Sequence, residues 1–541
     1  MSAGAPKMTA AQGLLVIAAC FVMAACSPSS PPAASATPAA ATNGPGIDVI
    51  ELSATDALQR MASGSLTSRV LTQAYLNRIA AIDDSGPALN AVIDLNPAAL
   101  EDAATLDAER KAGRLRGALH GLPVLVKDNI DVAGMVNSAG SLALAGNTPA
   151  RDAFLVARLR AAGAVILGRT NLSEWANFRS TRSTSGWSSR GGQTKNPYAL
   201  DRNPCGSSSG TGAAMAASLA ALGVGTETDG SIICPAAVNG LVGLKPTVGL
   251  VSRSGIIPIS VSQDTAGPMT RTVRDAALLL SALAGADAAD PAGSAAQGHA
   301  QADYSTGLSA DALRGKRIGL LRQAMGYHPD VDAATERAAQ AIRDAGGTIV
   351  DVKIPTWGKW DAPELEVLLY EFKDGLNRYL KSANATPGSL AALIEWNKAN
   401  ATRAMPLFAQ ELFVQAEAKG PLTDAAYRKA RDDARRLAGH EGLLAALDKG
   451  HLDAALAPSM SPAWLTDPVL GDHFVGAGYG IAAVAGTPSL TIPAGDSHGL
   501  PLGVTLMGRP WSEAELLGYG FALEQRLKAR RAPLFAAHAA D

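Results

Sequence analysis

The chain has little of what metal enzymes, redox enzymes and nucleic-acid-binding proteins depend on. It has only four cysteines in 541 residues, none in a CxxC pair, and its eight histidines are scattered, with no HExxH pattern. These absences argue against a metal site, and no cofactor is expected. The 47 basic and 49 acidic residues give a net charge of −2, and no basic stripe alternates with aromatic residues. Nucleic acid is therefore not expected as a partner.

The N-terminal apolar run is too short to cross a bilayer. It extends from Gly13 to Ala25 after a single lysine, Lys7, whereas a membrane-spanning helix needs about 20 residues. A short apolar run behind a basic residue is typical of a signal peptide, which we place at residues 1–25. The mature protein is therefore expected outside the cytoplasm, in the cell envelope or periplasm.

The residues after this run predict a tethered, lipid-anchored protein. The segment 23–26, Met-Ala-Ala-Cys, resembles a bacterial lipobox and predicts membrane attachment through a lipidated Cys26. Two alternatives stay open, a second lipobox-like segment at 17–20 and ordinary secretion with cleavage near Ala36. Residues 26–46 are rich in Ser, Pro and Ala and predict an extended tether, so the folded domain is expected at 47–541.

Helices and short apolar strands are predicted to alternate along the chain. Residues 317–352 show the pattern strand, helix, strand and predict a βαβ unit. Further helices are expected as two segments within 55–81, at 97–113, 154–162 and 275–286, as several segments within 363–446, and at 512–527. Further strands are expected at 122–127, 164–168, 222–227, 452–457, 489–492 and 502–507. Without an internal repeat, this alternation predicts one large α/β domain with a mixed sheet covered by helices on both faces.

The stretch from Pro204 to Pro235 contains the main candidate site. Two glycine-lined turns carry Ser207 and Ser231, which stand 24 residues apart. The segment Ala213–Val224 between them is almost wholly small and apolar, so it must pack and is no flexible linker. We expect a helix at 213–221 and a strand that together hold the two turns at one site.

Each candidate residue has an ordinary structural interpretation beside the functional one. Lys127 ends an apolar strand, where burial would lower its pKa and supply a neutral base, although a lone strand-end lysine more often reaches solvent. Ser231 precedes a helix expected to open near Pro235, so it could lie beside backbone donors for an oxyanion or simply cap the helix. The turn at Ser207 lacks the Gly-Lys-Ser/Thr that a phosphate loop requires.

Taken together, these signals resemble the amidase signature family. The matching segments are GLPVLVKDN at 121–129, GRTNLSEW at 168–175, GSSSG at 206–210, DGS at 229–231, GLVGLKPT at 240–247 and DTAGP at 264–268. The resemblance extends over residues 47–541 and is densest from 117 to 275. Segments 181–194, 204–210 and 225–235 are similar in particular to the bacterial peptide amidases of that family.

The resemblance implies a role for each candidate. Ser231 would be the nucleophile of an acyl-enzyme, Ser207 the bridging serine after a cis peptide bond, and Lys127 the base. The backbone N–H groups of Thr228, Asp229, Gly230 and Ser231 would form the oxyanion hole. The substrate would be a small peptide amide, whose C-terminal amide is removed with release of ammonia, and neither metal nor cofactor would take part.

Several alternatives stay open at this point. Within the family they are a broad aliphatic or aryl amidase and an amidotransferase subunit that acts on charged tRNA, against which the export signal and the lack of basic character argue. A solute-binding lipoprotein of the envelope would share the N-terminus and fold, but it would not need the two serines and the lysine. Cys205 and Cys234 flank the serines, and the sequence does not establish whether they form a disulfide.

Overall fold

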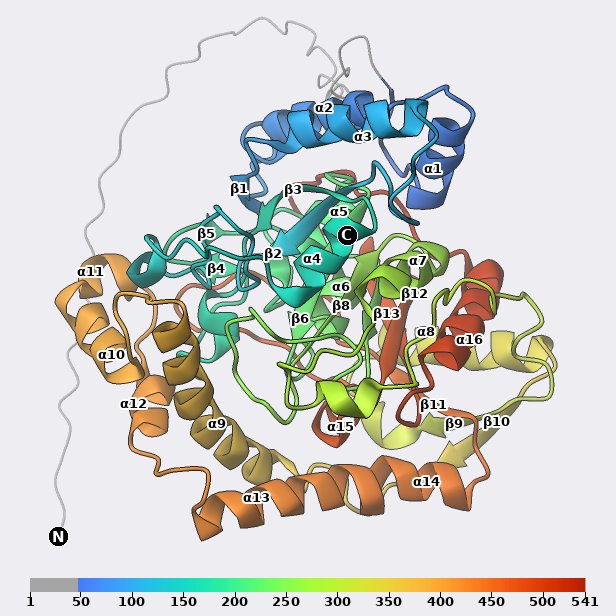
Figure 1. Ribbon diagram of the computed structural model, residues 1–541. Coiled ribbons are helices and arrows are strands. Elements are labelled where there is room, and N and C mark those ends of the chain that lie inside the picture. The colour runs from blue at the N-terminus through green and yellow to red at the C-terminus, as the bar shows by residue number, and fades with distance from the viewer. Residues whose placement is uncertain (1–46, 541) are drawn as a thin grey trace, which may run out of the picture. The chain divides into compact units, whose positions relative to one another are not determined.

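An eleven-stranded mixed sheet runs through the computed structural model (Figure 1). The structure describes residues 47–540, so the expectations for the signal peptide, Cys26 and the tether lie outside the described residues. The strands, in their order across the sheet, are β1 (Val92–Leu95), β3 (Val165–Thr170), β2 (Pro123–Lys127), β6 (Leu222–Glu227), β8 (Thr265–Thr270), β7 (Val242–Lys245), β12 (Ser489–Ser497), β13 (Leu500–Met507), β11 (Ala454–Pro458), β9 (Arg317–Leu321) and β10 (Thr348–Val352).

The sheet is parallel in two places and antiparallel between them. Strand β2 pairs in parallel with both β3 and β6, and β9 pairs in parallel with both β10 and β11. The remaining neighbours, including β6 with β8 and β12 with β13, are antiparallel. The C-terminal strands β12 and β13 therefore lie in the middle of the sheet, between β7 and β11.

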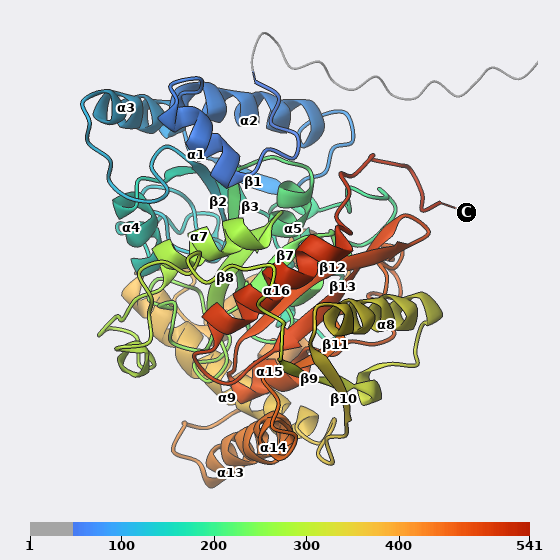
Figure 2. The same cartoon turned by 90° about the vertical axis from the view of Figure 1, so that its right-hand side faces the viewer.

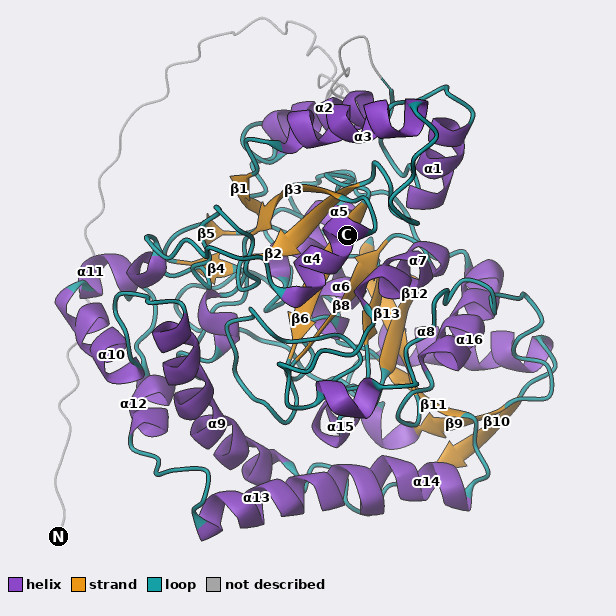
Figure 3. Cartoon of the chain, in the orientation of Figure 1, coloured by secondary structure: helices purple, strands orange, loops and turns teal. Residues whose placement is uncertain are grey.

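Helices flank this sheet, as Figures 2 and 3 show. Helices α5 and α6 contact each other and pack on β6 and on β12 and β13, while α7 and α16 contact each other and pack on β8 and β12. The α-helices are α1 (Ala54–Ala62), α2 (Ser68–Ile82), α3 (Ala99–Lys111), α4 (Phe154–Ala161), α5 (Ser209–Ala216), α6 (Ile233–Val238), α7 (Val273–Leu283), α8 (Pro329–Asp344), α9 (Asp361–Ser382), α10 (Leu390–Ala399), α11 (Ala401–Ala404), α12 (Glu411–Glu417), α13 (Ala425–Arg435), α14 (Leu444–Lys449), α15 (Gly480–Ala485) and α16 (Glu513–Leu527).

Most predicted elements are confirmed within a few residues. The βαβ unit is β9, α8 and β10, and its two strands are parallel. The helix expected at 213–221 is wrong in its bounds, because α5 begins at Ser209 and ends at Ala216. It ends there because Ser218 has a φ of 56°, which is outside the helical range. The predicted domain boundary at residue 47 stays a prediction.

The strands around the candidate site are fully buried, which agrees with their apolar sequences. Every residue of β2, β3, β6 and β8 is buried, as parallel strands covered on both faces require. In the register of β2, Val126 lies beside Arg169 of β3 and Val224 of β6. The end of β2, where Lys127 stands, is therefore delivered into the interior beside β6.

Candidate active site

Lys127 is buried at the end of β2 and points at the first of the two serines. Its Nζ donates hydrogen bonds to Ser207 Oγ at 2.7 Å and to Thr226 Oγ1 at 2.9 Å, and its side chain has no exposed surface. The solvent-reaching interpretation of this lysine is therefore wrong. Burial lowers its pKa from 10.5 to about 7, an effect that the nearby carboxylates of Glu227 and Asp264 partly oppose.

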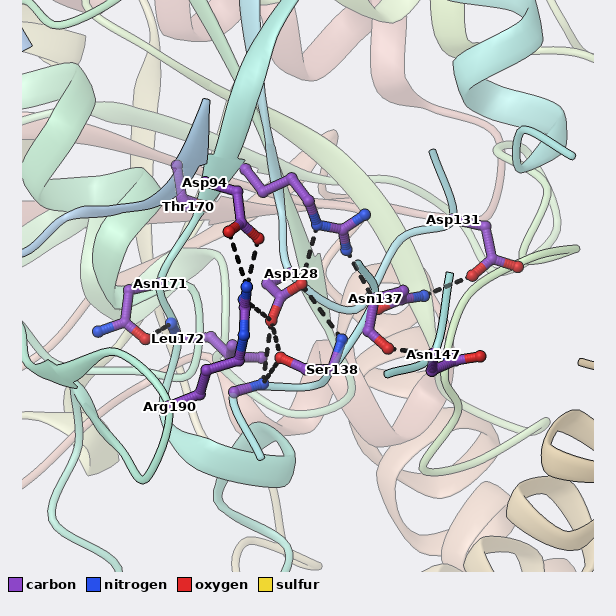
Figure 4. A network of polar contacts seen from close by, with 12 residues as sticks. Asp94, Asp128, Asp131, Asn137, Ser138, Asn147, Thr170, Asn171, Leu172 and Arg190 are labelled. Carbon is purple, nitrogen blue, oxygen red and sulfur yellow. Dashed lines mark hydrogen bonds and ion pairs between the residues drawn. The ribbon is translucent and has the colours of Figure 1, made fainter. Parts of the chain in front are cut away.

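Polar contacts around the next residue, Asp128, hold this strand end in place. Its carboxylate accepts a hydrogen bond from Arg169 Nε at 2.8 Å, and both side chains are completely buried. Figure 4 shows the same carboxylate between Arg190 and the hydroxyl of Ser138, which donates to it. Arg190 also forms an ion pair with Asp94 at 2.7 Å. Because these contacts come from separate loops and strands, they fix the backbone on which Lys127 stands.

The first serine turn is held tightly against its surroundings. The peptide bond between Gly206 and Ser207 is cis, as the resemblance implied. Gly206 has no room for a side chain, because a Cβ there would overlap the hydroxyl of Ser173. Helix α5 begins two residues after Ser207, so the turn leads directly into a buried helix. The hydroxyl of Ser207 is thereby presented to Lys127.

The second serine turn joins β6 to α6. Ser231 follows Gly230, which has a φ of +78° and packs so closely on the ring of Tyr479 that a Cβ would overlap it. Glu227 accepts hydrogen bonds from the N–H groups of Ile232 at 2.7 Å and Ile233 at 2.9 Å, so these donors at the start of α6 are occupied. This carboxylate therefore fixes the turn relative to the helix.

Backbone donors in this turn remain available. In the described structure, no hydrogen bond within the protein is donated by the N–H groups of Thr228, Asp229 or Ser231. Three such donors beside a serine are the arrangement that stabilises an oxyanion during acyl transfer. Their surroundings are acidic, since burial together with Glu364 and Glu227 raises the pKa of the Asp229 carboxyl well above its ordinary value.

The two serine turns are joined to each other. The N–H of Ser208 donates to the carbonyl oxygen of Ser231 at 3.2 Å. A disulfide between Cys205 and Cys234, with Cα atoms 6.0 Å apart, connects the residue before Gly206 to helix α6. No hydrogen bond joins the hydroxyls of Ser207 and Ser231 in the described structure. The structure thus brings the predicted relay together, with the Lys127–Ser207 hydrogen bond formed.

Ser231 faces a cleft of about 290 Å³. The cleft also borders Gly206, Thr228 and Asp229, and its walls are largely apolar and aromatic. The remaining lining residues are Ala176, Asn177, Phe178, Ser185, Cys205, Ile259, Leu368, Met460, Trp464, Asp472, Phe474 and Tyr479. A cleft of this kind, with a few polar groups at one end, is typical of a binding site for a small organic molecule.

Two negative findings concern residues 47–540 only. Within that range no cluster of three or more His, Cys, Asp or Glu side chains is arranged to hold a metal ion. No helix of that range has the length and apolar character needed to cross a membrane.

Sequence reasoning missed several residues that position the site. Thr226 accepts hydrogen bonds from Lys127 and from Asn129 Nδ2 at 3.0 Å, and Asp128 anchors the strand end. A signal existed for Thr226, because it is a hydroxyl residue in the apolar strand 222–227, three residues before the DGS motif. No comparable signal indicated that Arg169 would be the partner of Asp128, since the two residues are 41 positions apart.

Comparison with known proteins agrees with this geometry. A family model described as Amidase matches residues 70–517. The chain belongs to the amidase signature family. The solved structure of peptide amidase from Stenotrophomonas maltophilia is 56% identical, covers 89% of this chain and 98% of its own, and superposes with a TM-score of 0.87.

Curated relatives place the chain in the same family. A probable amidase of Arabidopsis thaliana is 40% identical and covers 87% of this chain and 89% of its own length. One subunit of the glutamyl-tRNA(Gln) amidotransferase of Cereibacter sphaeroides is 36% identical, with 88% and 97% covered. The chain is thus an amide-hydrolysing enzyme of the amidase signature family, similar to peptide amidase.

Proposed function

We propose that this amidase removes the C-terminal amide of peptides and releases ammonia, with Ser231 as the nucleophile. The observation that carries the catalytic assignment is the 2.7 Å hydrogen bond from a fully buried Lys127 to Ser207, in a turn bonded to the turn of Ser231. The similarity to peptide amidase supports the choice of substrate.

The proposed reaction begins with proton transfer from the nucleophile. Neutral Lys127 takes the proton of Ser207, and Ser207 takes that of Ser231, as the Ser231 oxygen attacks the amide carbon. Because the lowered pKa of Lys127 leaves a large neutral fraction near neutral pH, the amine can act as a base. The carbonyl oxygen becomes an oxyanion, which the N–H groups of Thr228, Asp229, Gly230 and Ser231 would receive.

The second half of the reaction reverses these transfers. The C–N bond breaks, the nitrogen takes a proton from Ser207, and Lys127 returns its proton to Ser207. Ammonia leaves, and the acyl group stays on Ser231. Water then attacks the acyl-enzyme with the same two residues as base, which releases the peptide acid and restores Ser231.

Two alternatives use the same catalytic residues. A broad aliphatic or aryl amidase would hydrolyse simple amides equally well, and an amidotransferase subunit would pass ammonia to another active site. Peptide amides are favoured because the 56% identity to peptide amidase exceeds the 36% identity to the amidotransferase subunit over a similar share of the chain.

The test measures ammonia released from a blocked dipeptide amide by the wild type and by Ser231→Ala, Ser207→Ala and Lys127→Met. Each variant should lose at least about a thousandfold in kcat/KM. The control is Ser209→Ala, which removes another buried hydroxyl from the same turn and should keep most of the activity. Wild-type rates in Ser231→Ala and Lys127→Met would refute the catalytic assignment, whereas hydrolysis of simple amides alone would refute only the peptide substrate.

We also propose that the protein is exported and held at the membrane through Cys26. The disulfide between Cys205 and Cys234 supports export, because such bonds persist mainly in oxidising compartments. A mass spectrum of the mature N-terminus should show a lipidated Cys26. An unprocessed N-terminus on a protein recovered from the cytoplasm would refute this proposal.

A further inference from the structure

A second, much smaller cavity borders the other serine of the relay. Ser207 lines this cavity, whereas Ser231 lines the cleft described above. Its volume is about 10 Å³, close to the smallest space that holds a single water molecule. The side chains of Ile256 and Ile257 form part of its wall. The cavity can therefore hold a molecule with one heavy atom and little more.

Two residues on the wall of this cavity carry oxygens that no group of the protein satisfies. Asn129 and Glu227 both line it, and neither Asn129 Oδ1 nor Glu227 Oε1 has a hydrogen-bond partner. Their other polar atoms are occupied, since Asn129 Nδ2 donates to Thr226 and Glu227 Oε2 accepts from Ile232 and Ile233. Buried acceptors are costly when unpaired, so these two oxygens suit a small molecule with at least two hydrogens to donate.

The small cavity and the cleft are neighbours. Ala176, Thr228 and Ile259 line both of them, so these residues stand at the boundary. An amide carbon bonded to Ser231 would lie on the cleft side of this boundary. Its nitrogen must lie next to Ser207, because Ser207 supplies the proton when the C–N bond breaks. The bond that breaks therefore points from the cleft toward the small cavity.

We propose that this cavity is the leaving-group site, and that its size restricts the enzyme to primary carboxamides, whose leaving group is ammonia. The inference rests on the proposed function and gives it a physical cause. Ammonia has one heavy atom and three N–H donors, and it matches both the space and the two unpaired acceptors. A peptide bond has a substituted nitrogen, and its next carbon atom would overlap the isoleucine wall.

The same site serves both halves of the reaction. When the C–N bond breaks, its electron pair stays on nitrogen, which takes one proton from Ser207 and becomes ammonia. Water, which is the same size, then enters beside Ser207, gives it a proton and attacks the acyl carbon. The cavity thus holds in turn the two smallest participants, while the peptide occupies the cleft.

The experiment compares a blocked dipeptide amide with its N-methylamide and measures the release of ammonia and methylamine. The wild type should hydrolyse the N-methylamide at least about 100-fold more slowly, the discrimination that one excess methyl group can produce in a tight pocket. Ile257→Val, which removes about one methyl group from the wall, should narrow this ratio about tenfold. Ile256→Val tests the same wall a second time.

Ile166→Val is the matched control, because it removes the same atoms from β3, away from the cavity. It should leave the ratio unchanged. The inference is overturned if the wild type releases methylamine as fast as ammonia, or if both wall variants stay active on the amide without gaining on the N-methylamide. In those cases ammonia release still upholds the proposed function. If no peptide amide is hydrolysed, the proposed function fails, and the inference fails with it.

Discussion

Cys205 and Cys234 connect the two catalytic turns covalently, three residues after Ser231 and two before Ser207. The bonded cysteines are 29 residues apart in sequence, and closing a loop of this size typically stabilises a protein by about 2–4 kcal/mol. We expect the double variant Cys205→Ser/Cys234→Ser to unfold at a lower temperature and to lose activity several-fold, since the turns are then held mainly by backbone contacts.

Thermal unfolding and kcat/KM, each measured with and without a reductant, check this prediction. The reductant should lower both quantities in the wild type and neither in the double variant. Equal sensitivity of the two proteins to the reductant would contradict a role for this bond.

The pH dependence of activity should follow the protonation of Lys127. Its pKa is lowered to about 7 by burial, and only the neutral amine can take the proton of Ser207. We therefore expect kcat/KM to fall about tenfold for each pH unit below that value and to level off above it. Among the neighbouring charges, Glu227 raises this pKa most. Glu227→Gln should therefore move the limb to lower pH, and an unmoved limb would show that another group titrates.

Breaking the buried ion pair of Asp128 should be strongly destabilising. Asp128→Asn leaves the guanidinium of Arg169 without its charged partner at a site with no exposure, a change that typically costs about 3–5 kcal/mol. The control is Asp94→Asn, because the ion pair of Asp94 with Arg190 is partly exposed and should contribute about 1 kcal/mol or less. Urea unfolding of both variants tests this order, and similar losses would contradict it.

Substitution of Gly230 should reveal how tightly the nucleophile turn is packed. Gly134 and Gly230 share a φ of +78°, but a Cβ at Gly134 meets nothing within 4 Å, whereas one at Gly230 overlaps the ring of Tyr479. Gly134→Ala therefore measures backbone strain alone, about 1 kcal/mol. Gly230→Ala should cost clearly more and should lower kcat at least about tenfold. Equal stability and full activity of the two variants would refute the close packing.

The sequence was sufficient to predict those parts of the fold that depend on local patterns. The alternation of apolar strands with helices predicted the βαβ unit at 317–352, because each element there packs on its neighbour in sequence. The placement of β12 and β13 between β7 and β11 could not be predicted, since strand order depends on contacts between distant segments. The start of α5 at Ser209 was also missed, because its first turn contains glycines that are typical of loops.

The candidate site divides in the same way. The resemblance placed Lys127, Ser207 and Ser231 in one site, and the structure brings Lys127 within hydrogen-bonding distance of Ser207. The buried contacts that support them, from Thr226 and from Arg169 to Asp128, depend on the pairing of β2 with β6 and β3. Side chains that meet only across a sheet leave no pattern along a single sequence.

The central position of β12 and β13 has a consequence for how the enzyme becomes active during its synthesis. These strands end at Met507, close to the C-terminus, yet they lie between β7 and β11 in the sheet. A nascent chain that has emerged only as far as β11 has all three catalytic residues but no continuous sheet to carry them. Hydrolytic activity should therefore appear only when the chain is nearly complete, which would keep an exported amidase inert until translocation is almost finished.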